Sequence, residues 1–115
     1  MSGIVFFGTA AHDAVIDFYV GTVGAEVWLE QPGCTILRHG EFRFGFCERE
    51  ETDDCGIVTF VYDTREEVDE MHECLGEAAR EEPHENERYR IYQFFAEDPD
   101  GRTVEFQTFL HETPG

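Results

Sequence analysis

Hydrophobic and polar residues alternate in two short segments near the C-terminal end of the chain. Residues 92–96 (Tyr-Gln-Phe-Phe-Ala) and 102–109 (Arg-Thr-Val-Glu-Phe-Gln-Thr-Phe) are rich in aromatic and β-branched residues, which favours β-strands. Between them lies Asp-Pro-Asp-Gly at 98–101, a turn sequence in which proline fixes one φ angle and glycine accepts a positive one. The pattern predicts a β-hairpin whose second strand carries a carboxylate, Glu105, between two apolar neighbours.

An internal repeat organises the rest of the chain. Ile-Val-Phe-Phe at 4–7 is echoed by Ile-Val-Thr-Phe at 57–60, and a segment with helical spacing follows each run. Thr64 and Glu67 form a capping-box pattern at the start of the second helical segment. The apolar helical positions are Val15, Phe18 and Tyr19 in the first half and Val68, Met71, Leu75 and Ala78 in the second.

Strand-like stretches follow each predicted helix. They are residues 25–30, 34–38 and 42–47 in the first half, and 90–96 and 102–109 in the second. Residues 81–88 are polar and irregular, so we expect the remaining strand of the second half to be short or hidden there. The sequence therefore predicts an α+β fold of two βαβββ modules, about 1–52 and 53–115, within a single domain of residues 1–115.

A period of two assigns the faces of the predicted strands. One parity is wholly apolar and should lie under the helices: Val5, Phe7, Phe44, Phe46, Val58, Phe60, Val104 and Phe106. The other parity mixes small, polar and apolar residues, as a ligand cavity does: Ile4, Phe6, Gly8, Arg43, Gly45, Cys47, Ile57, Thr59, Val61, Thr103, Glu105 and Gln107. The alternative is a sheet face covered by a dimer partner.

The composition narrows the classes of partner. Asp and Glu number 26 against 8 basic residues, all arginine, and the formal net charge is −18. Such a chain lacks the basic patch that nucleic acids and anionic membranes need, so we expect neither partner. Glutamate-rich sequences without lysine resemble those of salt-loving organisms, in which molar salt screens the self-repulsion. We therefore interpret the charge as a solvation device rather than as an attraction for a cationic ligand.

We expect a cytoplasmic location and, as a consequence, unpaired cysteines. The sequence has no signal-peptide pattern and no apolar run of roughly 18 residues. Without secretion, Cys34, Cys47, Cys55 and Cys74 are expected to be unpaired, small buried hydrophobes. The five histidines lack the spacing of a ligand cluster, and we interpret them as surface residues.

The motifs resemble the vicinal oxygen chelate superfamily, which includes glyoxalase I, extradiol dioxygenases and bleomycin-resistance proteins. The resemblance covers nearly the whole chain and rests on Val-Ile-Asp-Phe-Tyr at 15–19 followed by Val23-Gly24, on the repeat, and on Asp-Pro-Asp-Gly at 98–101 with Glu105 beyond it. It implies a curved, partly closed mixed sheet with helices on its outer face and a pocket on its concave face. It also implies a homodimer.

The resemblance further implies a metal site with four ligands, and this chain departs from it. Carried over position by position, the ligand positions fall on Ile4, Gly45, Ile57 and Glu105. Aliphatic side chains and glycine cannot coordinate a divalent cation, and one carboxylate is a poor site. We therefore expect no metal and no cofactor.

The predicted pocket retains a set of ligand-binding candidates. They are Phe6, Arg43, Ile57, Thr59, Gln93, Phe95, Glu105 and Gln107, of which Gln93 and Phe95 follow from the resemblance. Arg43 and Glu105 occupy matching strands and could form a pair. Three hypotheses follow: a binding protein for a small organic molecule, a lyase or isomerase with Glu105 as general base or lone metal ligand, and a drug-sequestering resistance protein. We prefer binding, because no second acid–base partner stands out.

Overall fold

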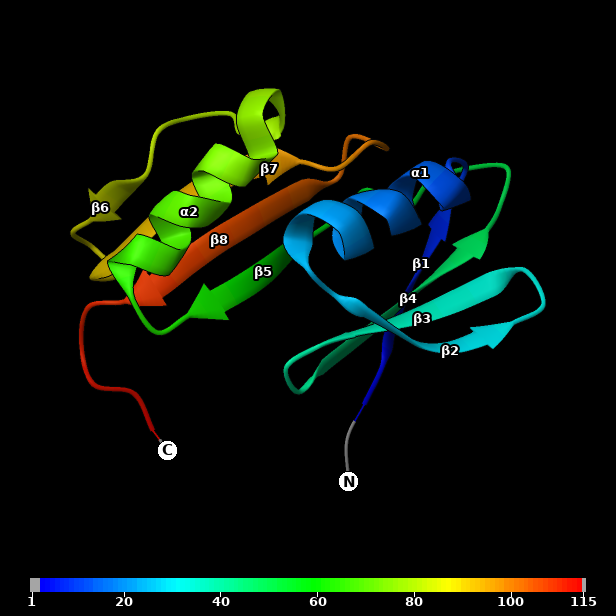
Figure 1. Cartoon of the computed structure of the whole chain (residues 1–115), viewed down its shortest axis with the longest axis horizontal. Helices are drawn as coiled ribbons and strands as arrows, with labels where there is room; N and C mark the ends of the chain where they lie inside the picture. The colour runs from blue at the N-terminus through cyan, green and yellow to red at the C-terminus, as the bar shows by residue number, and fades with distance from the viewer. Residues whose placement is uncertain (1–2, 115) are drawn as a thin grey trace. The chain divides into compact units, whose positions relative to one another are not determined.

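The computed structural model describes residues 3–114, which form two compact units (Figure 1). The first unit comprises the chain up to Cys55 together with Pro99–Gly101, and the second comprises Gly56–Asp98 and the residues from Arg102 onward. Each unit contains one mixed, four-stranded sheet and a helical segment. The predicted α+β fold of two βαβββ modules is therefore confirmed.

The first module has the strand order β1-β4-β3-β2. Its elements are β1 (Val5–Thr9), α1 (His12–Asp17), the π-helical segment η1 (Phe18–Val23), β2 (Glu26–Gln31), β3 (Cys34–His39) and β4 (Phe42–Glu48). β1 lies parallel to β4, whereas the other pairs are antiparallel. Gly24, with φ 93°, ends η1 in the left-handed conformation that glycine adopts at little cost.

The second module repeats this order as β5-β8-β7-β6. Its elements are β5 (Ile57–Tyr62), α2 (Arg65–Leu75), the 3₁₀ segment η2 (Gly76–Ala78), β6 (His84–Asn86), β7 (Ile91–Glu97) and β8 (Thr103–Phe109). β5 lies parallel to β8, as β1 does to β4. The strand expected within the acidic stretch is present as the short β6, and the internal repeat is reproduced in the topology.

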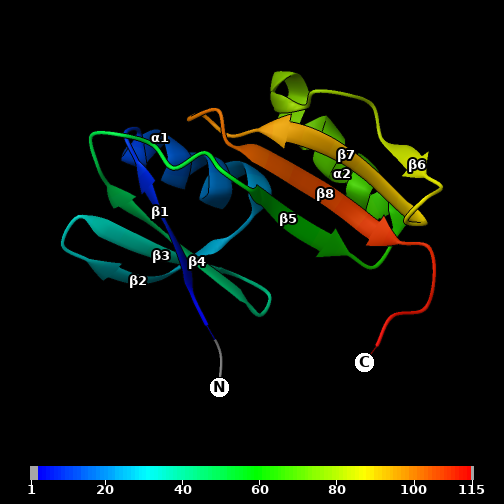
Figure 2. The same ribbon diagram turned by 180° about the vertical axis from the view of Figure 1, so that it is seen from behind.

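Helix α2 covers one face of the second sheet. Thr64 begins it as predicted, because the Thr64 side-chain oxygen accepts a hydrogen bond from the Glu67 backbone N–H at 3.2 Å. Val68 and Leu75 are buried along the helix, and the His72 ring meets Phe94 edge-on with centroids 5.1 Å apart. Figure 1 shows α2 in front of the sheet, and Figure 2 shows the opposite face with no helix across it. The second sheet therefore has a covered face and an open face.

The buried residues largely follow the predicted parity. The buried members are Phe44, Phe46, Val58, Phe60, Val104 and Phe106. Phe7 is half-buried, and Val5 is 41% exposed, which corrects the assignment of Val5 to the core. Val5 is the first residue of the edge strand β1, at the end of the strand that lies farther from α1, and its only paired strand among the described residues is β4.

The prediction of four unpaired, buried cysteines is wrong. Cys34 and Cys47 form a disulfide, and Cys55 and Cys74 are exposed. The pairing follows from the register, since Cys34 lies directly opposite Cys47 in the antiparallel β3–β4 pair with Cα atoms 4.1 Å apart. The prediction of unpaired cysteines rested on the expected cytoplasmic location, which carries no information about which strands become neighbours.

A buried ion pair closes the β7–β8 hairpin. The Asp98 carboxylate accepts hydrogen bonds from the Arg102 backbone N–H at 3.0 Å and from Arg102 Nη1 at 2.5 Å. Both side chains are fully buried. Gly101 supplies the positive φ of 81° that the turn needs. The ion pair thus fixes the point at which β8 begins, four residues before Glu105.

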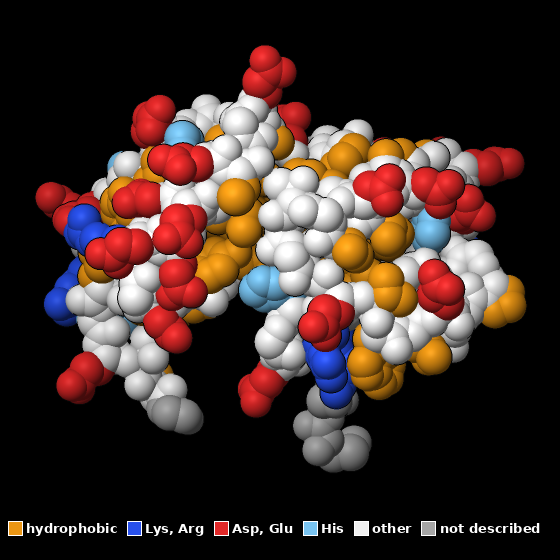
Figure 3. All heavy atoms as spheres, viewed as in Figure 1, with side chains coloured by type: hydrophobic (Ala, Val, Ile, Leu, Met, Phe, Trp, Pro, Cys, Tyr) orange, Lys and Arg blue, Asp and Glu red, His pale blue; other side chains and the backbone are white. Residues whose placement is uncertain are grey.

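The surface is acidic on the visible face of both units. Figure 3 shows carboxylate side chains scattered over that face rather than gathered in one patch. None of the described helices is long and apolar enough to cross a membrane.

Candidate functional site

An open cavity of about 390 Å³ lies on the open face of the second sheet. Successive side chains of a strand point to opposite faces of the sheet. The side chains of β5, β7 and β8 that do not face α2 therefore all point to this face. The cavity is lined by Ile57, Asn86, Tyr89, Ile91, Gln93, Phe95, Glu105, Gln107 and Phe109. The lining combines apolar and aromatic walls with three carboxamides and one carboxylate, which is the composition of a small-molecule site.

A chain of hydrogen bonds holds the Glu105 carboxylate in place. The Thr59 hydroxyl donates to Glu105 Oε1 at 2.9 Å, and Gln93 Nε2 donates to Glu105 Oε2. Asn86 Nδ2 in turn donates to Gln93 Oε1 at 2.8 Å, and the Tyr89 backbone N–H donates to Asn86 Oδ1 at 3.3 Å. Each carboxylate oxygen thus accepts one bond from a neutral group. The network fixes the orientation of the carboxylate and leaves further lone pairs on it.

Gln107 has unused hydrogen-bonding capacity in the same cavity. Its Oε1 is buried, and no described residue donates a hydrogen bond to it. A buried acceptor without a donor costs about 1–3 kcal/mol. Gln107 lies two residues beyond Glu105 on β8, so both side chains point to the same face. A bound molecule with a hydrogen-bond donor would satisfy this group.

The structure brings together most of the residues predicted for the site. Five of them line the second-module cavity, namely Ile57, Gln93, Phe95, Glu105 and Gln107. Thr59 belongs to the same site through its hydrogen bond to Glu105. Their predicted role in ligand binding stays a prediction.

Phe6 and Arg43 lie in the first module instead. Phe6 lines a different cavity, and the Arg43 guanidinium stacks over the Trp28 ring at 4.8 Å from its centroid. The pairing of Arg43 with Glu105 stays a prediction, since the hydrogen bonds described above come to Glu105 from its own module.

Four lining residues were missed by the sequence reasoning. Ile91 and Phe109 share the parity of Gln93 and Gln107, so extending the alternation to the strand ends would have found both. Asn86 and Tyr89 lie in and after the short strand β6, within a polar segment that carries no alternation. No sequence signal marks these two.

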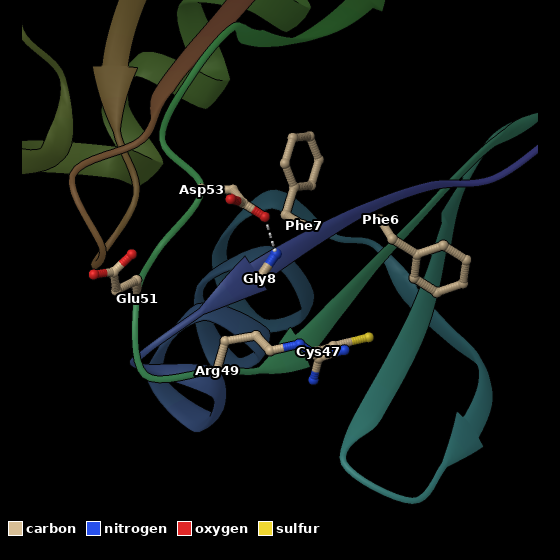
Figure 4. A pocket seen from close by; sticks show the side chains of 7 residues that line it. All are labelled: Phe6, Phe7, Gly8, Cys47, Arg49, Glu51 and Asp53. Carbon is tan, nitrogen blue, oxygen red and sulfur yellow. Dashed lines mark hydrogen bonds between the residues drawn. The ribbon is translucent and has the colours of Figure 1, made fainter.

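The cavity of the first module differs in chemistry. It measures about 370 Å³ and is lined by Phe6, Phe7, Gly8, Cys47, Arg49, Glu51 and Asp53, as Figure 4 shows. The buried Gly8 backbone N–H beside this cavity is already satisfied, because it donates a hydrogen bond to Asp53 Oδ2 at 2.7 Å. A Cβ atom on Gly8 would lie 3.0 Å from Arg49 Cγ, so the connecting segment packs closely on β1. We interpret this cavity as a loop-packing feature.

The residues present do not fit a divalent metal ion. In the sheet register Gly45 lies opposite Phe6, and Glu105 lies opposite Thr59. These positions, together with Ile4 and Ile57, offer one carboxylate and one hydroxyl as donors. Among the described residues no group of three His, Cys, Asp or Glu side chains is placed to hold a metal.

His12 was expected at the surface, but its ring is mostly buried. The ring forms hydrogen bonds with the side chains of Thr35 and Asp13.

Tyr62, whose pKa is raised, lies on the covered side of the second sheet. Tyr62 shares the parity of Val58 and Phe60, and its ring stacks on Phe106 with centroids 6.4 Å apart. Burial, helped by the charge of Glu67, raises the pKa of Tyr62 to about 12. This group belongs to the core side and does not take part in the cavity.

Known structures share this architecture. A glyoxalase/bleomycin resistance protein/dioxygenase family enzyme from Burkholderia phytofirmans PsJN superposes with a TM-score of 0.80 at 21% identity, covering 93% of this chain and 97% of that one. A lactoylglutathione lyase from Agrobacterium tumefaciens superposes with a TM-score of 0.74 at 23% identity, covering 94% of this chain and 91% of that one. An integron cassette protein from the mobile metagenome of the Halifax Harbour sewage outfall superposes with a TM-score of 0.80 at 16% identity, covering 95% of this chain and 98% of that one.

These comparisons establish the fold. No family model matches the chain, and no curated protein matches it. The chain has the fold of glyoxalase/bleomycin resistance/dioxygenase proteins, which is the fold that the sequence resemblance predicted. Because proteins of one fold carry different activities, the function has to be argued from the cavity.

Proposed function

We propose that this chain binds a small organic molecule in the cavity of its second module, without a metal ion. The observation that carries the proposal is a buried carboxylate, Glu105, held by two hydrogen bonds at the floor of a largely apolar cavity. The cavity of about 390 Å³ is within the usual size for small ligands. Gln107 adds a buried acceptor that a ligand would satisfy.

The lining favours binding over catalysis. A general base usually works with a second group that delivers or receives a proton. Among the described lining residues Glu105 is the one carboxylate, and the other titratable side chain is that of Tyr89, which is 58% exposed. The hypotheses of a Glu105 general base and of drug sequestration stay predictions.

The experiment is a fragment titration of the ¹⁵N-labelled full chain. Small aromatic alcohols, amines and carboxylic acids are added singly, and amide shifts are mapped onto the sequence. We expect the largest shifts at residues of β7 and β8 that line the cavity. Ile57→Ala should weaken binding, because it removes an apolar wall, whereas Ile4→Ala, the equivalent position of the repeat, should leave it unchanged. Shifts scattered over the surface, or none, would overturn the proposal.

We also propose that the chain forms a homodimer. All six residues of β2 are exposed although Val27, Trp28 and Leu29 are apolar, and β2 is an edge strand. Exposed apolar edge strands of this kind commonly associate with a second chain. Sedimentation equilibrium should show twice the mass of 13.3 kDa, and Trp28→Glu should shift the population to monomer. A monomer at all concentrations would contradict this proposal.

A saline environment is the remaining proposal, and the net charge of −18 supports it. Screening by salt reduces repulsion between exposed carboxylates, so the thermal midpoint should rise steeply with the first additions of potassium chloride. A midpoint that is constant from dilute buffer to molar salt would show that the acidic surface has another role.

A further inference from the structure

We infer that the ligand of the second-module cavity is an organic ammonium compound with an aromatic or branched apolar body. The inference rests on the proposed function and names the class of molecule that the same cavity takes. It follows from the charge of the cavity, from its acceptors and from its walls.

The charge of Glu105 lacks a partner within the second module. The residue is only 9% exposed, and both of its hydrogen-bond donors, Thr59 and Gln93, are neutral. Among the described residues of that module no arginine or histidine forms a salt bridge with Glu105, and the chain contains no lysine. Burying a charge is costly unless an opposite charge accompanies it. A cationic ligand supplies that charge.

The acceptors of the cavity match an ammonium group. Each Glu105 oxygen has accepted one hydrogen bond and retains a further lone pair, and Gln107 Oε1 lacks a donor among the described residues. Both acceptors lie on the same face of β8, two residues apart, at roughly 7 Å between Cα atoms. An ammonium has several N–H donors and no acceptor, so it can serve both groups without conflict.

The walls of the cavity fit the body of such a ligand. Phe95, Phe109 and Tyr89 present aromatic rings, and Ile57 and Ile91 present branched aliphatic side chains. Aromatic faces attract cations as well as apolar groups. None of the described lining residues is cationic, so a carboxylate or phosphate ligand would place a second negative charge beside Glu105. The lining therefore selects against anions.

Three probes of one shape test this inference. Phenethylammonium, 2-phenylethanol and phenylacetate differ chiefly in the charge of the terminal group, and each is titrated into the ¹⁵N-labelled full chain at the lowest potassium chloride concentration that keeps it folded. We expect phenethylammonium to bind about tenfold more tightly than 2-phenylethanol, with phenylacetate weakest, and with shifts at Gln93, Phe95, Glu105 and Gln107.

Matched variants identify the group responsible. Glu105→Gln preserves the shape of the side chain and removes its charge. The affinities for phenethylammonium and 2-phenylethanol should therefore become about equal. Glu73→Gln, an exposed position on α2, makes the same change in net charge and should leave the preference intact. Gln107→Leu should weaken phenethylammonium more than 2-phenylethanol, because the ammonium uses both acceptors.

The outcomes separate the two proposals. Equal affinity for all three probes at the cavity residues, or a preference for phenylacetate, would overturn the ammonium class while leaving small-molecule binding intact. A preference that survives in Glu105→Gln would also overturn it. Absence of binding by all three probes would overturn the proposed function and the ammonium class together. If Glu105→Gln fails to fold, the ranking of the probes on the unaltered chain decides.

Discussion

The two modules share a backbone but use equivalent positions in opposite ways. In the first, Phe6 lies opposite Gly45, and a Cβ atom on Gly45 would lie 2.6 Å from the Phe6 ring. In the second, Thr59 lies opposite Glu105 and donates a hydrogen bond to it. In the first sheet the Phe6 ring lies over Gly45, whereas in the second sheet Thr59 and Glu105 leave room for a largely apolar cavity with a carboxylate at its floor. A duplicated scaffold can thus keep a binding cavity in one copy and pack the other.

The modules also stabilise their central hairpins differently. The β3–β4 hairpin is joined by the Cys34–Cys47 disulfide at the end away from its turn, and the β7–β8 hairpin by the Asp98–Arg102 ion pair at the turn itself. The ion pair fixes where β8 starts, and therefore where Glu105 points. The disulfide lies in the first module and does not set the orientation of Glu105.

The largest effect is expected from breaking the ion pair. Asp98→Asn should lower the free energy of unfolding by about 3–5 kcal/mol, because it removes the negative charge that faces the fully buried Arg102 guanidinium. Urea denaturation measures this. Glu97→Gln is the control. Glu97 lies on the same hairpin and forms an exposed ion pair with Arg80, so its substitution should lower the free energy of unfolding by less than about 1 kcal/mol. Equal costs at both positions would show that burial of the pair has no special role.

Removing the disulfide should have the next largest effect. The double variant Cys34→Ala/Cys47→Ala should lose about 3 kcal/mol, since the bridge closes a loop of 13 residues and restricts the unfolded chain. Cys55→Ala/Cys74→Ala changes the two exposed thiols and should be neutral. The difference is measured by denaturation under non-reducing conditions. An unaffected Cys34→Ala/Cys47→Ala variant would mean that the bridge is absent in solution.

A smaller loss is expected from the floor of the cavity. Thr59→Val preserves the shape of the side chain but removes the donor to Glu105, so the free energy of unfolding should fall by about 1.5 kcal/mol. Thr59→Ser keeps a hydroxyl and should recover most of that loss. If Thr59→Val matches the unaltered chain, the hydrogen bond does not hold the carboxylate and the contrast between modules weakens.

The smallest expected effect tests the packed floor of the first module. Gly45→Ala should destabilise by about 1 kcal/mol, because the added methyl meets the Phe6 ring, which is half-exposed and can turn aside. In a Phe6→Ala background the same substitution should be neutral or stabilising. Thermal denaturation of the four-member cycle measures the coupling. Additive effects would show that Phe6 and Gly45 are not packed together.

The sequence predicted the parts of this picture that depend on local periodicity. The repeat, the α2 cap at Thr64, the hairpin turn and the face that carries Glu105 all follow from spacing along the chain. The disulfide and the contribution of Asn86 depend on which strands become neighbours and in what register, and no local pattern contains that information. Val5 was misplaced for the same reason, since parity along a strand does not say what covers its end.

The most direct test of the central claim is a crystal structure of the full chain with phenethylammonium. The account predicts the ammonium nitrogen within hydrogen-bonding distance of the Glu105 carboxylate, with the phenyl ring against Phe95 and Ile57. A ligand found only in the first-module cavity beside Arg49 and Asp53, or density that avoids Glu105, would contradict it.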